Sequence, residues 1–380
     1  MTENDVTTEI RGGLSRREFL TGTLGVAAAA ALAACSSPGA SLSSATVSTS
    51  MAAKAHVDGD LYYFNWAQYI HPSLIKGFEK KYGVNVHQTY FSSNDDMMAK
   101  MASNVSYDAV IPVSHNMPRL IQGGLLRPID KAQLQNWDQV IPYFQNPWFD
   151  PQAAHSIPYA MGPTGIAWRT DQVTDMKQSW NDLWDHPDAK GKIFVIDEAQ
   201  EALGMSLLRL GFDINSSNPD EVGKAADALI QLKPVLAGFS ANDQGNLLSG
   251  AAWIQHAWSG DVYFALQQAK NPTIYQYENP TNGTPFSANT VCIPTNAKHP
   301  GTATLFLDWL LQPDHAAKNV TYIGYPNGAK AGMDEFARLV KDFPWLNVTE
   351  DMITNANWFH ALDGPAQQLW NSEWTRVKAS

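Results

Sequence analysis

The sequence is poor in cysteine, in charge and in long apolar runs. Cys35 and Cys292 are its only cysteines among 380 residues, and 17% of the residues are charged. No segment beyond the N-terminal region has eighteen consecutive apolar residues, which predicts a soluble body. The formal net charge is −11 and no cluster of Lys and Arg occurs. Both features argue against a nucleic-acid-binding protein.

The sequence also lacks the short motifs of common enzymes. It contains no Gly-x-Ser-x-Gly, no His-Glu-x-x-His, no phosphate-binding loop and no Cys/His spacing suited to a metal. Its ten His are scattered along the chain. These absences argue against an exported enzyme such as a hydrolase, and no catalytic residue, metal or cofactor is expected.

Aromatic and other apolar residues are abundant. Hydrophobic residues make up 44% of the chain, and there are 13 Trp, 13 Tyr and 15 Phe. A chain of this length and composition can bury a large core and is expected to form two domains or two lobes. Trp is seldom used only to fill volume, because its indole N–H needs a partner when it is buried. The aromatic content therefore suggests an aromatic-lined binding surface.

The first 35 residues have the features of an export signal. Twin arginines, Arg16-Arg17, precede an apolar run from Leu24 to Ala34 that is too short to span a membrane stably. This arrangement resembles a Tat signal, and Leu32-Ala33-Ala34-Cys35 resembles the lipobox of bacterial lipoproteins. The resemblance implies lipidation of Cys35 and a protein anchored on the outer face of the cytoplasmic membrane, in the periplasm or cell-envelope space. Cys292, in an apolar segment, would then be an unpaired core residue.

Behind the signal, residues 36–56 are rich in Ser and Ala and predict a flexible tether. From Asp60 onward, apolar segments alternate with amphipathic ones, which predicts an α/β fold with a largely parallel sheet. Strands are expected at residues 61–64, 84–91, 107–112, 157–168, 193–196, 252–258 and 290–293. Helices are expected at residues 72–82, 96–101, 199–210, 221–232, 260–268 and 302–311.

The segment after the first expected strand is unusual. Leu61 to Phe64 reads as a buried strand, but large side chains rather than small turn residues follow it: Trp66, Gln68 and Tyr69, before Pro72 begins a helix. In open parallel sheets the loops at the carboxyl ends of the strands face a ligand crevice. The pattern therefore places Trp66 and Tyr69 at a candidate binding site.

Several segments along the body match segments of one protein family, and they occur in the same order along the chain. They are Leu61–Tyr69, Tyr107–Pro112, Ser156–Tyr159, Ser179–Trp184, Trp258–Asp261, Ile293–Lys298, Ile323–Asn327 and Trp374–Lys378. Together they resemble the polyamine-binding (spermidine/putrescine) solute-binding lipoproteins of ABC importers, from about Asp60 to the C-terminus.

This resemblance implies a periplasmic-binding-protein-like fold, with two α/β lobes, a hinge of two crossing strands and a ligand cleft between the lobes. The crossings would lie near residues 158–163 and 287–289. The first lobe would comprise residues 57–162 and 289–330, and the second lobe residues 163–288 and 331–380. Closure of the lobes on a ligand is the implied mechanism.

A polyamine needs aromatic faces for its methylenes and carboxylates for its ammonium groups. The resemblance implies that the residues supplying these contacts are Trp66, Tyr69, Glu198, Glu201, Trp258 and Asp261, with His115 on a site-facing loop. Each has a simpler alternative. The aromatic residues could pack a loop against its helix, and the acids could serve the positive end of a helix dipole. His115 could be a structural or surface residue.

The sequence departs from the family at several positions. Gln68 and Asn289 stand where acids are usual, Ser287 replaces an aromatic residue, and Phe359 replaces a polar one. Losing a charge-assisted hydrogen bond in a closed site costs about 1.5–3 kcal/mol. Gln68 and Asn289 therefore leave two alternatives open. Another acid, Glu198 or Asp261, compensates, or the ligand is a less charged amine, an amino-acid derivative or a quaternary ammonium compound.

The expected function is therefore capture of a small cationic amine, similar to putrescine or spermidine, outside the cytoplasm for an ABC importer. The expected partners are that amine, the permease and ATPase subunits, and the membrane, through lipid on Cys35. The chain shows no sign of oligomerisation, so a monomer is expected. An exported enzyme and a lipoprotein scaffold remain as competing classes.

Overall fold

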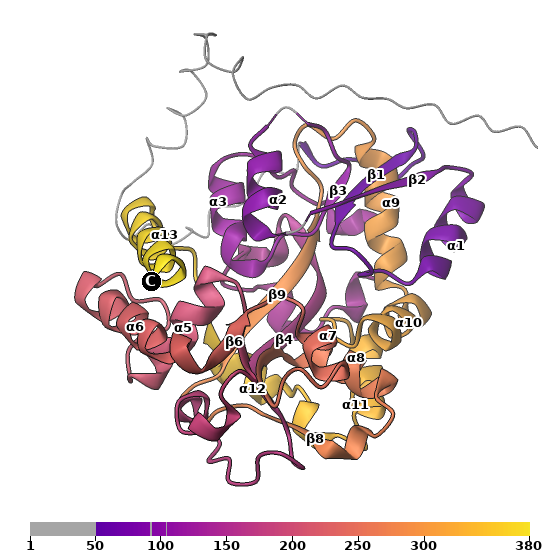
Figure 1. Ribbon diagram of the computed structural model, residues 1–380. Coiled ribbons are helices and arrows are strands. Elements are labelled where there is room, and N and C mark those ends of the chain that lie inside the picture. Colours follow the sequence, from indigo (N-terminus) through magenta and orange to yellow (C-terminus); the bar gives the residue numbers. More distant parts are fainter. Residues whose placement is uncertain (1–50, 92, 104) are drawn as a thin grey trace, which may run out of the picture. The chain divides into compact units, whose positions relative to one another are not determined.

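The computed structural model describes residues 51–91, 93–103 and 105–380 (Figure 1). The expected signal peptide, Cys35 and the part of the tether before residue 51 lie outside the described residues. Within the described residues, no helix combines the length and apolar character needed to cross a membrane.

The strands form one mixed sheet in the order β2-β1-β3-β9-β4-β7-β5-β6, with β10 paired to β9 and β8 paired to β4. The strand bounds are β1 Leu61–Asn65, β2 Val86–Tyr90, β3 Ala109–Val110, β4 Ser156–Arg169, β5 Ile193–Val195, β6 Leu236–Phe239, β7 Ile254–Trp258, β8 Tyr275–Glu278, β9 Pro285–Cys292 and β10 Asn357–Trp358.

Helices surround this sheet (Figure 1). Their bounds are α1 Pro72–Tyr82, α2 Asn94–Met101, α3 Met117–Gln122, α4 Pro142–Gln145, α5 Ala199–Arg209, α6 Pro219–Leu232, α7 Asp243–Leu248, α8 Ser259–Gln268, α9 Pro300–Leu311, α10 Pro313–Ile323, α11 Lys330–Leu339, α12 Glu350–Asn355 and α13 Gly364–Ala379. Short 3₁₀ turns lie between them, including η2 Ser114–Asn116 and η6 Trp180–Leu183.

The long strand β4 connects the two ends of the sheet. Its first half, from Ser156 to Pro163, pairs with β9, and its second half, from Thr164 onward, pairs with β7 and β8. In Figure 1, β9 runs between the part of the sheet that holds β1 to β3 and the part that holds β4 and β6. The two crossings expected near residues 158–163 and 287–289 therefore correspond to a paired stretch of β4 and β9.

The prediction of a largely parallel sheet was only partly correct. The pairs β1·β2, β1·β3, β5·β6, β5·β7 and β9·β10 are parallel, but β4 is antiparallel to β7, β8 and β9, and β9 is antiparallel to β3. The βα periodicity indicates parallel pairing only for strands joined by a helix. The crossing strands pair with strands far away in sequence, and periodicity carries no signal for that.

The first βα unit shows how local sequence sets the elements that position the site. Helix α1 begins at Pro72, and the His71 side chain accepts a hydrogen bond from the backbone N of Ser73. The helix ends at Gly83, whose φ of 68° lies in the left-handed region that glycine tolerates well. Proline at the start and glycine at the end thus fix α1, as expected from the sequence. The short loop before α1 is held between β1 and this helix.

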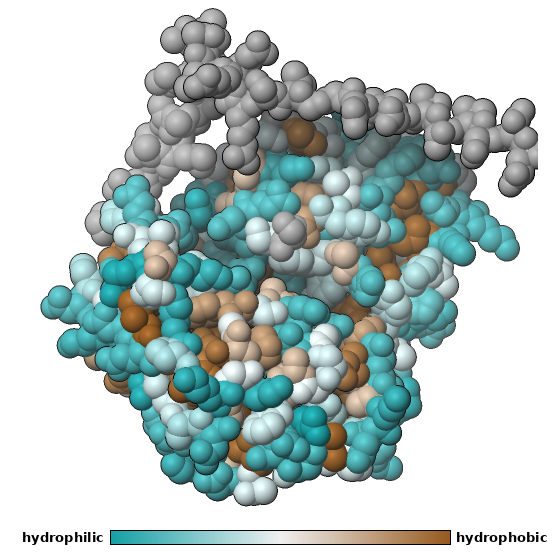
Figure 2. All heavy atoms as spheres, in the orientation of Figure 1, coloured by the Kyte–Doolittle hydropathy of each residue, from teal (hydrophilic) through white to brown (hydrophobic). Residues whose placement is uncertain are grey.

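Two buried hydrophobic clusters support the fold. The larger contains residues of β1, β3, β9 and α9, and the smaller contains residues of β5, α5, α6 and α13. Cys292 is fully buried in the larger cluster and is a free thiol, so the prediction of an unpaired core cysteine is confirmed. On the face seen in Figure 2 most residues are hydrophilic, and apolar ones gather near the centre, over the region of β4 and β6 in Figure 1.

Candidate ligand-binding site

The loop that follows β1 presents aromatic side chains at the end of that strand. The side-chain oxygen of Asn65 accepts a hydrogen bond from the backbone N of Trp66 at 2.8 Å. The half-buried Trp66 packs edge-on against Phe91, with ring centroids 4.3 Å apart. Gln68 is exposed and has a φ of 56°, which is uncommon for a residue with a side chain. This turn at Gln68 redirects the chain between Trp66 and Tyr69.

Tyr69 connects this loop to the crossing strands. The Tyr159 hydroxyl, from β4, donates to the carbonyl oxygen of Tyr69. The Tyr69 hydroxyl in turn donates to Oδ1 of Asn289, on β9, at 2.9 Å. The Tyr69 ring lies 5.5 Å from that of Tyr159 and 6.2 Å from that of Tyr325. Tyr69 and Asn289, both predicted site residues, are therefore in direct contact.

Trp258 and Glu201 also meet. Trp258 is the last residue of β7, and its indole N–H donates to Oε1 of Glu201 at 2.9 Å. Glu201 lies in the first turn of α5 and is 7% exposed. Its second oxygen, Oε2, is buried without a hydrogen-bond partner in the described part of the chain. Burial raises the pKa of the Glu201 carboxyl to about 7.

Glu198 is the residue that precedes α5, one turn before Glu201. Burial raises the pKa of its carboxyl to about 7, and the negative charges of Glu201, Asp95 and Asp197 add to the shift. Asp95 lies in the first turn of α2. The two glutamates thus form a poorly solvated acidic pair at the start of one helix.

Asp261 belongs to a second acidic pair. Its Oδ1 accepts from Nε2 of Gln244 at 3.1 Å and from the Tyr325 hydroxyl at 3.2 Å. Its neighbour Asp243 is fully buried. Burial raises the pKa of both aspartates, and the charge of Asp261 raises that of Asp243 further.

Trp258 joins the two acidic pairs. Its indole N–H binds Glu201, and its backbone N donates to Oδ2 of Asp243 at 3.1 Å. A continuous set of contacts therefore runs from Asn289 through Tyr69, Tyr325 and the aspartates to Trp258 and Glu201. Among the described residues no Lys or Arg pairs with any of the four carboxyl groups, whereas surface acids elsewhere do form such pairs.

Two residues of this network were missed by sequence reasoning: Tyr325 and Asp243. Tyr325 packs closely on Gly260, since a β-carbon there would collide with its ring, and a β-carbon at Gly162 would lie 3.4 Å from Cδ1 of the same ring. The segments that hold Tyr325 and Gly260 both stood among those that resemble the family, and this was the available signal. Asp243 opens the short helix α7, and nothing in the local sequence distinguishes it from a helix-capping acid.

Other predicted positions lie outside this network. No hydrogen bond or ring contact in the described residues joins Trp66, Gln68 or His115 to it. His115 is buried, its Nδ1 has no partner in the described part of the chain, and burial lowers the pKa of its ring to about 3, so it is neutral. Its ring lies 6.1 Å from that of Phe359.

Phe359 and Ser287 occupy the two remaining positions at which the sequence departs from the family. Phe359 is 1% exposed and packs on Gly204 of α5. Ser287 lies on β9 opposite Gly162 of β4.

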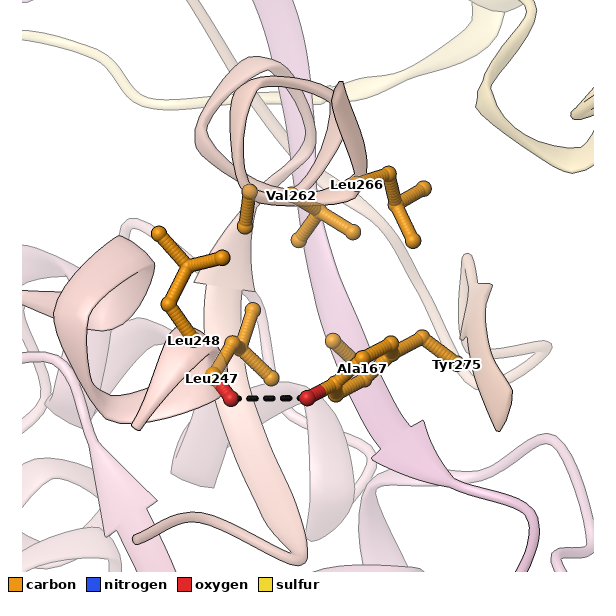
Figure 3. Close-up of a pocket in the computed structure, with 7 residues that line it drawn as sticks. Ala167, Leu247, Leu248, Val262, Leu266 and Tyr275 are labelled. Atoms are coloured by element: carbon orange, nitrogen blue, oxygen red, sulfur yellow. Dashed lines mark hydrogen bonds between the residues drawn. The ribbon is translucent and has the colours of Figure 1, made fainter. Parts of the chain in front are cut away.

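A separate pocket between α7 and α8 does not suit a charged ligand. Figure 3 shows its lining of aliphatic side chains, with Tyr275 donating through its hydroxyl to the carbonyl oxygen of Leu247 at 2.8 Å. None of its lining residues carries a charge. The acidic network, rather than this pocket, has the chemistry to bind a cation.

Comparison with known proteins identifies the family of the chain. The family model for bacterial extracellular solute-binding proteins matches residues 73–342. The spermidine/putrescine-binding periplasmic protein of Escherichia coli is 32% identical over 332 residues, which cover 86% of this chain and 94% of the relative. A putrescine/agmatine-binding protein of Pseudomonas aeruginosa is 26% identical and covers 84% of this chain and 91% of its own length.

Solved structures give the same result. A putative spermidine/putrescine ABC transporter structure from Listeria monocytogenes superposes with a TM-score of 0.79 at 27% identity. The matched region covers 84% of this chain and 99% of that one. A lipoprotein of Treponema pallidum gives a TM-score of 0.74 at 26% identity, with 83% and 98% coverage. The expected two-lobed fold of periplasmic binding proteins is thereby confirmed.

Proposed function

The chain belongs to the family of bacterial extracellular solute-binding proteins, and from this premise we propose that its ligand is a polyamine such as putrescine or spermidine. The substrate-binding role follows from the family. The observation that carries the choice of ligand is the group of four buried or half-buried carboxyl groups around Trp258, none of which pairs with a Lys or Arg of the described residues. A cationic ligand would supply the positive charge that these carboxyl groups do not receive from the described residues.

The chemistry of the network fits a short diamine. An ammonium group is stabilised by carboxylates through charge-assisted hydrogen bonds, and its methylenes pack against aromatic faces. Glu201 offers a buried carboxyl oxygen beside the Trp258 indole, and Asp261 offers a second acid beside the Tyr325 ring. The two acidic pairs lie on either side of one Trp, an arrangement suited to a ligand with more than one positive charge.

The less charged ligand considered from the sequence has weaker support. That alternative rested on the amides at Gln68 and Asn289, which reduce the negative charge of the site. Asp243 adds a carboxyl group that sequence reasoning did not count, next to Asp261. This pair supports the other alternative, in which different acids compensate for the two amides.

The family and the sequence support a proposal for how the bound amine reaches the importer. In our proposal the two lobes, with the boundaries given above, close on the amine, and the closed form delivers it to the permease of an ABC importer. A monomer tethered by residues 36–56 and anchored through lipid on Cys35 would remain close to that permease. The relatives compared above are named as binding proteins, and we expect no catalytic turnover from this chain.

Isothermal titration with putrescine and spermidine tests the ligand directly, alongside amino acids, betaine and sugars in thermal-shift screens. A ligand that binds only the folded state raises the melting temperature. Glu201→Gln should weaken amine binding by about tenfold or more, because the lost charge-assisted hydrogen bond is worth about 1.5–3 kcal/mol. Trp66→Ala tests the aromatic loop, with Trp66→Phe as the conservative variant.

Glu350→Gln, on the exposed first turn of α12, is the matched control and should bind like the parent protein. If no polyamine binds, the proposed ligand is wrong. Unchanged affinity in both Glu201→Gln and Trp66→Ala would place the ligand somewhere else on the protein.

A further inference from the structure

We propose that Gln244, in the first turn of α7, is a positioning residue for amine binding, because its side-chain amide holds the Asp261 carboxyl group in place to meet an ammonium group. This inference rests on the proposed function. It adds a residue that acts on the ligand through Asp261 rather than by contact with it.

The contact between Gln244 and Asp261 joins two helices. Nε2 of Gln244, on α7, donates to Oδ1 of Asp261, on α8, at 3.1 Å, although the two residues are 17 positions apart in the chain. The same oxygen accepts from the hydroxyl of Tyr325 at 3.2 Å. Two donors that reach one oxygen from different segments oppose rotation of the carboxyl group. A carboxylate has about four acceptor positions on its two oxygens, so these donors leave acceptor capacity for an ammonium group.

Helix α7 gives Gln244 a fixed base. Oδ2 of Asp243 accepts from the backbone N of Trp258 at 3.1 Å, and Oδ1 of Asp243 accepts from the backbone N of Gln244 at 3.2 Å. One turn later, Nδ2 of Asn246 donates to Oε1 of Gln255, on β7, at 3.1 Å. These hydrogen bonds attach α7 to the strand that ends at Trp258. The first turn of α7 therefore contacts both Trp258 and Asp261, two of the predicted site residues.

The chemical type of the donor also points to a cation. In the part of the chain that the structure describes, Asp261 forms no ion pair with Lys or Arg, and both donors to its Oδ1 are neutral. A basic residue at position 244 would pair with the carboxylate and compete with a cationic ligand. A neutral amide orients the carboxylate and favours its ionised form, but it leaves the negative charge available to the ligand.

The titratable groups that face Asp261 supply no positive charge. They are Asp243 of α7, Tyr69 in the loop after β1 and Tyr325 in the segment after α10. Burial raises the pKa of both tyrosines, so they are neutral near pH 7. Burial also raises the pKa of Asp261, and the hydrogen bond from Gln244 opposes that shift. Loss of the amide should therefore raise the pKa of Asp261 further.

Gln244→Met tests the proposal, because it keeps the length of the side chain and removes the donor. Titration calorimetry with putrescine from pH 5 to pH 8 measures affinity, and the ligand stays charged throughout, since aliphatic ammonium groups resemble Lys, with a pKa of about 10.4. We expect about tenfold weaker binding at pH 7. An ammonium group prefers the ionised carboxyl group, so affinity should also begin to fall at a higher pH on acidification than it does in the parent protein.

Gln244→Lys should move the pH profile in the opposite direction. Its positive charge stabilises the ionised form of Asp261, so the contribution of Asp261 should persist to lower pH, while competition with the ligand weakens binding at every pH. Glu198 and Glu201 titrate in the same range in every variant. The difference from the parent protein, rather than the profile of any one variant, therefore reports on Asp261.

Gln172→Met is the matched control. Nε2 of Gln172 donates to Oδ2 of Asp171 at 3.2 Å, which is the same kind of hydrogen bond on an exposed part of the surface. This variant should match the parent protein in affinity and in pH profile. Circular dichroism melts establish that the variants fold. If Gln244→Met does not fold, Gln244→Asn takes its place, since it withdraws the donor by one methylene group and should shift the profile in the same direction.

The outcomes separate this inference from the function on which it rests. Equal affinity for putrescine in the parent and a folded Gln244→Met would overturn the inference and leave the proposed function intact. Weaker binding with an unchanged pH profile would also overturn it, because Gln244 would then only join α7 to α8. Profiles of Gln244→Met and Gln244→Lys that shift in the same direction would do the same. Failure of every polyamine to bind the parent protein would overturn the proposed function itself.

Discussion

At the scale of single residues, the properties of the site depend on the hydrogen bonds that its polar atoms make within the protein. Trp258 illustrates this, because its two N–H groups hold two different carboxyl groups in place. Asn289 illustrates the opposite case. Its Oδ1 accepts from the Tyr69 hydroxyl, so the amide fixes the aromatic loop but contributes no charge. A residue that departs from the family can thus keep a structural role while it changes the electrostatics of the site.

Asn289→Asp should therefore strengthen polyamine binding. The carboxylate can still accept from the Tyr69 hydroxyl, and it adds a negative charge near the ligand. A charge-assisted hydrogen bond of about 1.5–3 kcal/mol corresponds to an affinity about tenfold to more than a hundredfold higher. Titration calorimetry with putrescine measures the change. Asn371→Asp adds the same charge on the exposed face of α13 and should leave affinity unchanged. Equal affinities for the parent and Asn289→Asp would show that position 289 does not meet an ammonium group.

Glu278 provides a residue-scale prediction about stability. It is 6% exposed and lies close to a second buried acid, Asp182. Burial raises its pKa to about 8, and the charge of Asp182 adds to the shift. A carboxyl group that binds its proton more tightly in the folded state stabilises the fold below its unfolded pKa. That stability is lost as pH rises toward 8, at up to about 1.4 kcal/mol per pH unit.

Glu278→Gln should reduce this pH dependence, because the amide stays neutral. The melting temperature of the parent should fall between pH 5 and pH 8 more steeply than that of Glu278→Gln. Glu198 and Glu201 shift in the same direction, so the difference between the two proteins, rather than the slope of either, reports on Glu278. Parallel curves for the two proteins would mean that Glu278 is not titrating in this range.

At the scale of elements, the site is assembled where strand ends and helix starts meet. The hydroxyl of Tyr159, on β4, donates a hydrogen bond to the loop between β1 and α1. Strand β7 leads directly into α8, which carries Asp261. Helix α5 brings Glu201 to the indole of Trp258. The close approach of α8 to the Tyr325 ring needs a residue without a side chain at position 260.

Gly260→Ala should disturb the site through Tyr325. The added methyl group would collide with the Tyr325 ring and displace its hydroxyl from Asp261. We expect a loss of about 1–3 kcal/mol of stability from overpacking, and weaker amine binding. Gly223→Ala, in α6, is the matched helical control, because nothing lies within 4 Å of the added β-carbon. That control should be neutral or stabilising by about 0.5–1 kcal/mol. Equal melting temperatures and affinities for Gly260→Ala and the parent would contradict the close packing of Tyr325.

At the scale of the whole molecule, the sheet carries the connection between the two groups of elements that hold the site. β4 and β9 pair over residues 156–163, and beyond that point β4 pairs with β7 and β8 instead. Two strands are a narrow connection, and such hinges allow rigid groups to rotate about a few residues. This arrangement suits capture by closure, in which the ligand stabilises one of two conformations.

The anchor proposed at Cys35 also belongs to this scale. Cys35→Ser should move the exported protein from the membrane fraction to the soluble fraction, because serine cannot form the thioether to lipid. Ligand binding by the folded body should not change. Fractionation of cells followed by immunoblotting measures the distribution, and Ser37→Ala serves as the control. A membrane-bound Cys35→Ser protein would contradict the lipid anchor.

Much of the fold was predictable from the sequence. The expected strands at 157–168 and 193–196 and the helices at 72–82 and 199–210 agree with the structure within two residues. Their hydrophobic periodicity and capping residues are local signals. The antiparallel pairing of β4 and the early start of β9 at Pro285 were not predictable, because both depend on partners distant in the chain.

The sequence by itself determined the fold class, the α1 boundaries, the buried free Cys292 and the resemblance to polyamine-binding proteins. These depend on residue type and on spacing along the chain. Only the tertiary structure placed Asp243 against Asp261, Tyr325 over Gly260, and Trp258 between two acidic pairs. The physical reason is that the charge state of a carboxyl group depends on its burial and on its neighbours in space, and the order of residues along the chain does not specify either.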